Sequence, residues 1–204
     1  KMTTLANGLR VNSEGREGLQ TTAVGVWVDA GARYETVSNN GVAHMLEHMA
    51  FKGTESRSAQ DIAVEIESVG GHLNAYTSRE HTAYFVRVLK EDLALSVDIL
   101  ADILQRSTFA EEELERERTV VIQEIGQSED TPDDIIFDRL QEVSFPNQAL
   151  GRSILGPVEG VANMGREVLF DFMGQHYGAS RLLLCAAGAV DHDDLVALAE
   201  RNFG

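Results

Sequence analysis

The sequence contains a single cysteine, Cys185, among its 204 residues. One cysteine excludes an internal disulfide and any zinc site built from several cysteines. Because Cys185 lies in the apolar run RLLLCAAGAV, we expect it to be a buried strand residue. A lone cysteine is compatible with a reducing compartment but does not prove one.

Long hydrophobic runs are also missing. No stretch of eighteen or more apolar residues occurs, so no transmembrane helix is predicted. No basic segment followed by an apolar one opens the chain, so no signal peptide is expected, although a leader could have been removed. Repeats, low-complexity segments and linkers rich in Pro or Ser are absent, which favours one compact domain.

Basic residues are scarce: the sequence has 17 Lys and Arg and 33 Asp and Glu, which gives a formal net charge of -16. This composition argues against a nucleic-acid-binding protein, since a phosphate backbone needs a positive surface. The negative charge would attract basic partners or basic peptides. It could equally serve solubility alone, and both interpretations remain open at this point.

Hydrophobic patterns typical of strands and of helices are mixed along the chain. Strands are predicted within the segments 5–14, 21–35, 72–89 and 180–190. Helices are predicted within 42–51, 58–71, 91–106, 110–127, 131–145, 165–178 and 191–204. Hairpin-like strand pairs together with helix pairs predict an α+β sandwich rather than a repeating βαβ fold.

The segment GVAHMLEHMAFKGT (41–54) carries the most informative pattern. His44, Glu47 and His48 share one face of the predicted helix, and apolar residues cover the other directions. Ionisable groups on a buried helix need partners, because an unpaired buried charge is very costly. A zinc ion would satisfy all three groups, since two histidines one turn apart can bind it and a carboxylate beside them can take a proton from its water.

The order H-x-x-E-H is the inverted counterpart of the H-E-x-x-H metalloprotease motif. A second interpretation of the same residues is a pair of hydrogen-bonded core histidines with a Glu at the surface. The apolar surroundings of His44 and His48 favour the metal site.

A catalytic zinc usually takes three protein ligands, so the third must come from elsewhere. In EEELERERTVVIQEIG, Glu124 lies inside the apolar arc of the predicted helix, beside Val121 and Ile125. We therefore expect Glu124 to be the third ligand, and Glu117, two turns earlier on the same face, to orient a ligand. The alternative is that Glu124 pairs with an arginine such as Arg118.

Five segments, in order and correctly spaced, resemble the pitrilysin (inverzincin) metallopeptidases: HMLEH, FKGT, GGHLNAYTSREHTAYF, ERERTVVIQEI and LGRSILG. Within that family they are most similar to the branch containing the beta subunit of mitochondrial processing peptidase and its bacterial relatives. The resemblance covers essentially the whole chain. It implies an α+β fold, in which a mixed, mainly antiparallel sheet packs against helices, and a zinc-dependent endopeptidase activity.

The resemblance also implies roles for individual residues. His44, His48 and Glu124 would be the ligands of one zinc ion per chain. Glu47 would be the general base that activates the zinc-bound water for attack on a peptide carbonyl. Glu117 matches the second acidic residue of the third-ligand helix.

Five further residues match positions that contact the substrate in this family. Asn74 and Ala75 would lie on an edge strand that pairs with an extended peptide. Phe51 would line the pocket just after the scissile bond, unless it only packs in the core. Asp134 and Asp138, one helical turn apart, would receive an arginine upstream of the cut, because paired carboxylates suit a guanidinium; the alternative is a solvated acidic face.

The family's subunits are longer and consist of two similar halves around a chamber. Residues 1–204 therefore read as the N-terminal catalytic metallopeptidase domain, which needs the C-terminal half or a partner subunit and forms a homo- or heterodimer when full length. Expected substrates are peptides, possibly with basic residues, in a bacterial cytoplasm or else in the mitochondrial matrix. The rival hypothesis is a non-catalytic assembly subunit, which the intact motifs disfavour.

Overall fold

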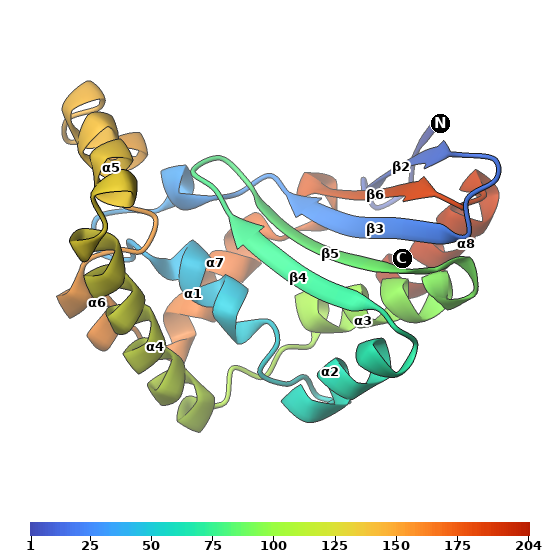
Figure 1. Ribbon diagram of the computed structural model, residues 1–204, viewed down its shortest axis with the longest axis horizontal. Coiled ribbons are helices and arrows are strands. Elements are labelled where there is room, and N and C mark those ends of the chain that lie inside the picture. The colour runs from blue at the N-terminus through green and yellow to red at the C-terminus, as the bar shows by residue number, and fades with distance from the viewer.

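The protein is described by a computed structural model that covers every residue from Lys1 to Gly204, and a six-stranded sheet forms its centre (Figure 1). The strands are β1 (Met2–Thr4), β2 (Arg10–Gly15), β3 (Thr21–Val28), β4 (His72–Thr77), β5 (Thr82–Leu89) and β6 (Leu182–Gly188). The α-helices are α1 (Val42–Met49), α2 (Ala59–Ser68), α3 (Leu93–Gln105), α4 (Glu111–Asp130), α5 (Pro132–Ser144), α6 (Val158–Ala162), α7 (Arg166–His176) and α8 (His192–Phe203).

The strand order across the sheet is β1-β2-β6-β3-β5-β4. The pair β2–β6 is parallel and the other four pairs are antiparallel. This confirms the predicted α+β fold with a mixed, mainly antiparallel sheet. It also makes β4 an edge strand, so one side of its backbone is free of a neighbouring strand.

One face of the sheet holds the hydrophobic core. Val24, Val26 and Val28 alternate along β3 and are at most 1% exposed, as their spacing predicts. Helices α1, α3 and α8 pack on the sheet, as Figure 1 shows. Cys185 is only half-buried, because it alternates with the core residues Leu184 and Ala186 and faces away from the helices.

Local capping residues fix three of the helices where the sequence predicts them. Ser58 begins α2, accepts a hydrogen bond from the Asp61 amide and completes a capping box. Pro132 occupies the first turn of α5. Asp191 caps α8 by accepting hydrogen bonds from two backbone amides. No helix is both long and apolar enough to cross a membrane.

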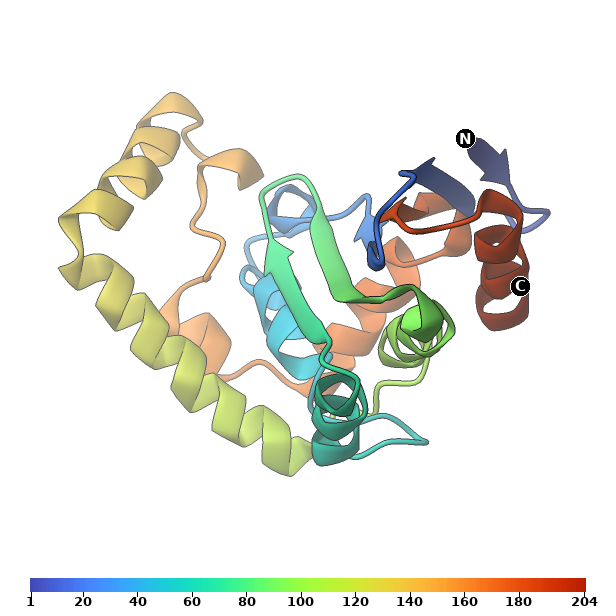
Figure 2. The same cartoon turned by 45° about the vertical axis from the view of Figure 1, so that its right-hand side comes forward.

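Helices α4 and α5 form an arm at one side of the molecule. Figure 2 shows α4 running past α1, with α5 turning upward from the end of α4. Helix α5 buries none of its residues, whereas α4 buries Leu114, Glu117, Val121 and Ile125. The buried side of α4, which packs against α1, therefore contains an acidic residue, Glu117. This arrangement positions the predicted metal ligands of the two helices.

A buried carboxylate ties α3 to the segment that follows α1. The Asp102 side chain is fully buried. It accepts hydrogen bonds from Arg106 Nε at 2.6 Å, Thr54 Oγ1 at 2.7 Å, Ser56 Oγ at 2.8 Å and Arg57 Nη1 at 2.9 Å. Burial alone would raise the pKa of this carboxyl, but the four hydrogen bonds outweigh it and lower the pKa to about 2.

We expect the substitution Asp102→Asn to lower the free energy of unfolding by about 3 kcal/mol, because it leaves two arginines without their buried partner. Since the folded pKa lies below the unfolded value, the carboxylate stabilises the fold above about pH 4, and this contribution of about 2 kcal/mol is lost as the pH falls through 2. Urea unfolding between pH 2 and pH 7 measures both effects.

Asp98→Asn is the matched control, because Asp98 accepts a hydrogen bond from the same Arg57 but its side chain is 40% exposed. We expect it to cost less than about 1 kcal/mol. Equal costs for the two variants, or an Asp102→Asn protein with the acid sensitivity of the wild type, would show that Asp102 does not hold these segments together.

Candidate metal centre

Helix α1 is held at its N-terminus by a carboxylate from outside the helix. Glu35 is buried and accepts hydrogen bonds from the amides of Gly41 and Ala43, both at 2.9 Å, and from the Asn40 side chain at 2.7 Å. Burial raises the pKa of Glu35, and these hydrogen bonds oppose the rise. A carboxylate at this end complements the helix dipole and satisfies free amides, so α1 begins at a defined residue.

The LGRSILG segment packs directly on this end of α1. Gly41 and Gly156 both have positive φ angles, 98° and 78°. A Cβ on Gly41 would lie 2.8 Å from the Leu155 carbonyl oxygen, and one on Gly156 would lie 2.5 Å from the Asn40 oxygen. Only glycine fits both positions, so the segment and the helix are fixed relative to each other.

The three predicted metal ligands meet between α1 and α4. The Nε2 atoms of His44 and His48 are 3.3 Å apart, and Glu124 Oε2 lies 3.7 Å from the first and 3.4 Å from the second. These three side chains form a group whose ligand atoms could hold one metal ion. Atoms bound tetrahedrally at about 2.1 Å from zinc are separated by about 3.4 Å, so the triangle has the size of a zinc site.

The surroundings of the two histidines are also compatible with metal binding. Burial lowers the pKa of His44 to about 4, helped by the neighbouring His48, so His44 is neutral at pH 7. His48 Nδ1 lies 2.9 Å from Glu117 Oε2, an arrangement in which Nδ1 carries the proton and donates it to the carboxylate. His48 Nε2 then presents a lone pair to the space beside Glu124, as metal binding requires.

Glu117 contacts the other ring nitrogen of His48, Nδ1, and a lysine. Its side chain is 8% exposed and its second oxygen lies 2.7 Å from Lys52 Nζ. Burial would raise the pKa of Glu117, but the contacts with Lys52 and His48 lower it below its usual value. The partner Lys52 was not identified from the sequence; it lies in the FKGT segment, in the bend that follows the end of α1.

The alternative pairing of Glu124 with Arg118 does not occur. Arg118 donates instead to Glu111 and to the Met164 carbonyl oxygen. The Glu124 side chain is 41% exposed, less buried than its place in the apolar arc predicts, and its carboxylate lies beside the two histidine rings.

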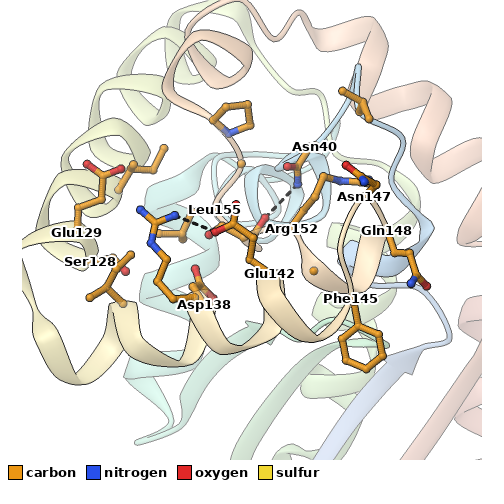
Figure 3. A pocket seen from close by; sticks show the side chains of 18 residues that line it. Asn40, Ser128, Glu129, Asp138, Glu142, Phe145, Asn147, Gln148, Arg152 and Leu155 are labelled. Atoms are coloured by element: carbon orange, nitrogen blue, oxygen red, sulfur yellow. Dashed lines mark hydrogen bonds and ion pairs between the residues drawn. The ribbon is translucent and has the colours of Figure 1, made fainter.

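A cleft of about 460 Å³ opens beside the cluster. Its walls come from α1, β4, α4, α5 and the 153–155 segment: His44, Glu47, Tyr76, Thr77, Ser128, Asp134, Phe137, Asp138, Ser153, Ile154 and Leu155. A neighbouring cavity of about 480 Å³, shown in Figure 3, shares Ser128, Asp138, Ser153 and Leu155 with it. Glu47 therefore lies in the same cleft as the two predicted arginine-binding aspartates.

The predicted substrate-contacting residues occupy different environments. Asn74 and Ala75 lie on the edge strand β4, where Asn74 Oδ1 accepts the Ala75 amide hydrogen at 2.8 Å. Phe51 packs against Tyr84, with ring centroids 6.4 Å apart, and does not line the cleft; its pocket role stays a prediction. Asp134 is exposed.

Two tyrosines near Glu47, the buried Tyr84 and the partly buried Tyr177, were not identified from the sequence. The hydroxyl groups of Tyr84 and Tyr177 lie 3.2 Å apart. Burial raises the pKa of Tyr177 to about 12, and the negative charge of Glu47 acts in the same direction on both phenols. Tyr84 follows the core alternation of β5, so nothing in the sequence pattern separates it from an ordinary core aromatic.

Comparison with known protein families gives two matches. The family described as Insulinase (Peptidase family M16) matches residues 10–158, which include the whole metal cluster and the cleft. The family described as Peptidase M16 inactive domain matches residues 163–204.

Among curated proteins, the mitochondrial-processing peptidase subunit beta of Bos taurus is 51% identical over 204 residues, which is all of this chain and 41% of that protein. The Homo sapiens protein of the same name is 50% identical, and the chain covers 42% of it. The chain thus spans less than half the length of these relatives.

Among solved structures, a protease from Helicobacter pylori superposes with a TM-score of 0.95 at 26% identity, over all of this chain and 49% of that one. The periplasmic protease PqqL from Escherichia coli gives a TM-score of 0.89 at 25% identity, over all of this chain and 23% of that one.

We expect the purified chain to bind one zinc ion. The substitutions His44→Ala, His48→Ala and Glu124→Gln should each abolish stoichiometric binding, because a site with three protein ligands loses most of its zinc affinity when one of them is removed. Glu117→Gln should weaken binding by about 10- to 100-fold by releasing His48 Nδ1. Competition with a zinc-binding dye measures each dissociation constant. Glu115→Gln, an exposed position on the same helix, is the control, and a loss of affinity there equal to that of Glu117→Gln would contradict the assignment.

Proposed function

Since the chain belongs to peptidase family M16, we propose that it is the metal-binding half of a zinc-dependent endopeptidase. The observation that carries this proposal is the His44–His48–Glu124 triangle, which opens beside Glu47 in a cleft along an edge strand. Two imidazoles and a carboxylate are a donor set typical of catalytic zinc.

The chain's own residues supply the acid–base chemistry of hydrolysis. Zinc, when bound, polarises a peptide carbonyl and lowers the pKa of water. Glu47 accepts the proton of the attacking water and passes it to the nitrogen of the leaving amine, as a general base that becomes a general acid. Glu117, held by Lys52, keeps the His48 ring in the orientation that frees its Nε2.

The edge strand β4 suits an extended peptide. Its free backbone side can add a further strand, a mode of capture that relies on main-chain hydrogen bonds and is tolerant of sequence. Thr77 Oγ1 donates to the Ala43 carbonyl oxygen at 3.3 Å, which ties β4 to α1. The Ala75 amide, now bonded to Asn74, is a donor that a substrate carbonyl would compete for.

The complete enzyme needs more than residues 1–204. The chain covers 41% and 42% of its two curated relatives, and their names describe a subunit of a peptidase. We infer that a C-terminal half, or a partner subunit, completes the substrate chamber in a homo- or heterodimer. The alternative of a non-catalytic assembly subunit is not favoured, because His44, His48 and Glu124 are all present and form one cluster, and His44 and Glu47 line the adjoining cleft.

We expect Glu47→Gln to reduce kcat by about 100- to 10,000-fold in the chain joined to its C-terminal half, because the general base is lost. Its zinc content should stay at the wild-type level, since no ligand is removed. Fluorogenic peptide assays and metal analysis measure the two properties. The exposed Glu55→Gln is the control and should leave both unchanged. Release of zinc by Glu47→Gln would contradict the assigned roles.

The isolated chain should cleave peptides poorly, and full activity without the second half would disprove the inference that two halves are needed.

Substrate preference provides a further prediction. We expect peptides with Arg two residues before the scissile bond to be cleaved with about 10- to 100-fold higher kcat/KM than matched Ala peptides, because an Arg–carboxylate contact contributes about 1.5–3 kcal/mol. Combined substitution of Asp134→Asn and Asp138→Asn should remove the preference. Assays at low salt avoid screening of the contact. No Arg preference in the wild type, or an unchanged preference in the double variant, would mean that these aspartates do not read the substrate.

A further inference from the structure

The cavity of about 480 Å³ in Figure 3 is distinct from the metal cleft. Its walls come from the end of α4, from α5, from the turn after α5 and from the LGRSILG segment (150–156). None of the three predicted metal ligands lines it, and Glu47 does not line it either. The two spaces share part of one wall, so a ligand in this cavity would lie beside the cleft without touching the metal cluster.

Most of the charged side chains that line the cavity are already paired. Arg139 Nη1 donates to Glu142 Oε2 at 2.8 Å. Arg79, from the β4–β5 turn, donates through Nη2 to Asp138 Oδ1, also at 2.8 Å. Each of these two pairs has no net charge, so neither gives the cavity a free cation or anion.

Two charged residues of the lining, Arg152 and Glu129, form no ion pair. Arg152 belongs to the LGRSILG segment and Glu129 to the last turn of α4, and Figure 3 shows them on different walls. The cavity therefore presents one uncompensated cation and, apart from it, one uncompensated anion.

Arg152 has donors that nothing in the chain uses. Its Nη2 donates to the backbone carbonyl oxygen of Glu35, but its Nε is buried without a hydrogen-bond partner. The Glu35 carboxylate does not take this donor, because its oxygens accept from the amides of Gly41 and Ala43 and from Asn40. A partly buried cation with an unpaired donor is unfavourable, and a carboxylate from a ligand would satisfy it.

The rest of the lining suits the groups of a peptide. The side-chain amides of Asn147 and Gln148 make no hydrogen bond within the chain, so they can donate to a peptide carbonyl and accept from a peptide N–H. Ile135, Phe145 and Leu155 add apolar surface. A cavity of 480 Å³ with a few polar groups on an apolar wall is within the size range of small-ligand sites.

We propose that this cavity binds a short peptide with two free ends, whose carboxylate pairs with Arg152 and whose ammonium group pairs with Glu129. A guanidinium is a preferred partner of a carboxylate, and only an unblocked peptide supplies both charges. Hydrolysis of a peptide bond creates one new carboxylate and one new ammonium group. The ligand is therefore a cleavage product held beside the cleft, and this origin rests on the proposed function.

Calorimetric titration of the metal-free 204-residue chain with the dipeptide Ala-Leu tests the site itself. The protein is kept free of metal because a carboxylate can bind zinc directly. Amidation of the carboxyl end and acetylation of the amino end should each weaken binding about five- to tenfold, since each removes a charge-assisted hydrogen bond. Equal affinities for the three peptides would overturn the proposal, as would binding that occurs only when zinc is present.

Two variants separate the two ends of the ligand. Arg152→Gln should weaken binding of Ala-Leu about tenfold and leave the affinity for the amidated dipeptide unchanged. Glu129→Gln should weaken binding of Ala-Leu and leave the affinity for the acetylated dipeptide unchanged. Because Glu129 is exposed, this second variant keeps the test valid if Arg152→Gln does not fold. If Glu129→Gln weakens the free and the acetylated dipeptide equally, the proposal is wrong.

The matched control combines Arg139→Gln with Glu142→Gln. It removes a paired cation and anion from the same cavity without changing the net charge, so the affinity for Ala-Leu should stay within about twofold of the wild type. A loss as large as that of Arg152→Gln would show that binding does not depend on the two unpaired charges, and would contradict the proposal.

An inhibition assay tests the origin of the ligand. In the chain joined to its C-terminal half, Ala-Leu should slow the cleavage of a longer peptide, because the cavity and the cleft share a wall. Arg152→Gln should raise the half-inhibiting concentration about tenfold. Cleavage that Ala-Leu does not slow would overturn the assignment of the ligand as a product. If the complete enzyme cleaves no peptide, the proposed function fails, and the calorimetric result then stands or falls separately.

Discussion

The structure depends on one requirement: the polar stripe of a nearly buried helix must be matched by carboxylates from a second helix. His44 and His48 belong to α1, whose other residues lie mostly in the core. Glu124 and Glu117 reach them from α4 at 2.9–3.7 Å. Glu35, which holds the N-terminus of α1, and the glycine contact with the LGRSILG segment (150–156) serve the same end, because they fix where α1 begins and hence where its histidines point.

Much of this arrangement could be predicted from local sequence. The spacing of His44, Glu47 and His48 fixes their shared helix face, and the place of Glu124 among apolar residues marks it as a partner. Ser58 and Asp191 cap two helices at the residues where the predicted ranges 58–71 and 191–204 begin. The short β1 and α6 were not predicted, since three and five residues are too few for a period to show.

The residues that were missed act through contacts that reach beyond their own helix or strand. Glu35 caps a helix that starts seven positions later, and Arg79 reaches an aspartate 59 residues away. Lys52 becomes meaningful only once α4 lies beside α1. The pattern of a single sequence shows which face of a helix or strand is apolar, but not which helices and strands contact each other. For the same reason, the parallel pairing of β2 with β6 could not be predicted from the sequence.

The central claim is that two histidines of α1 and one glutamate of α4 bind a single zinc ion. X-ray absorption spectroscopy of the zinc-loaded chain tests it most directly, because the spectrum reports the number and type of ligands. We predict two imidazole nitrogens and additional oxygen ligands at about 2.0–2.2 Å. A spectrum with sulfur at about 2.3 Å, or one without imidazole scattering, would contradict the account.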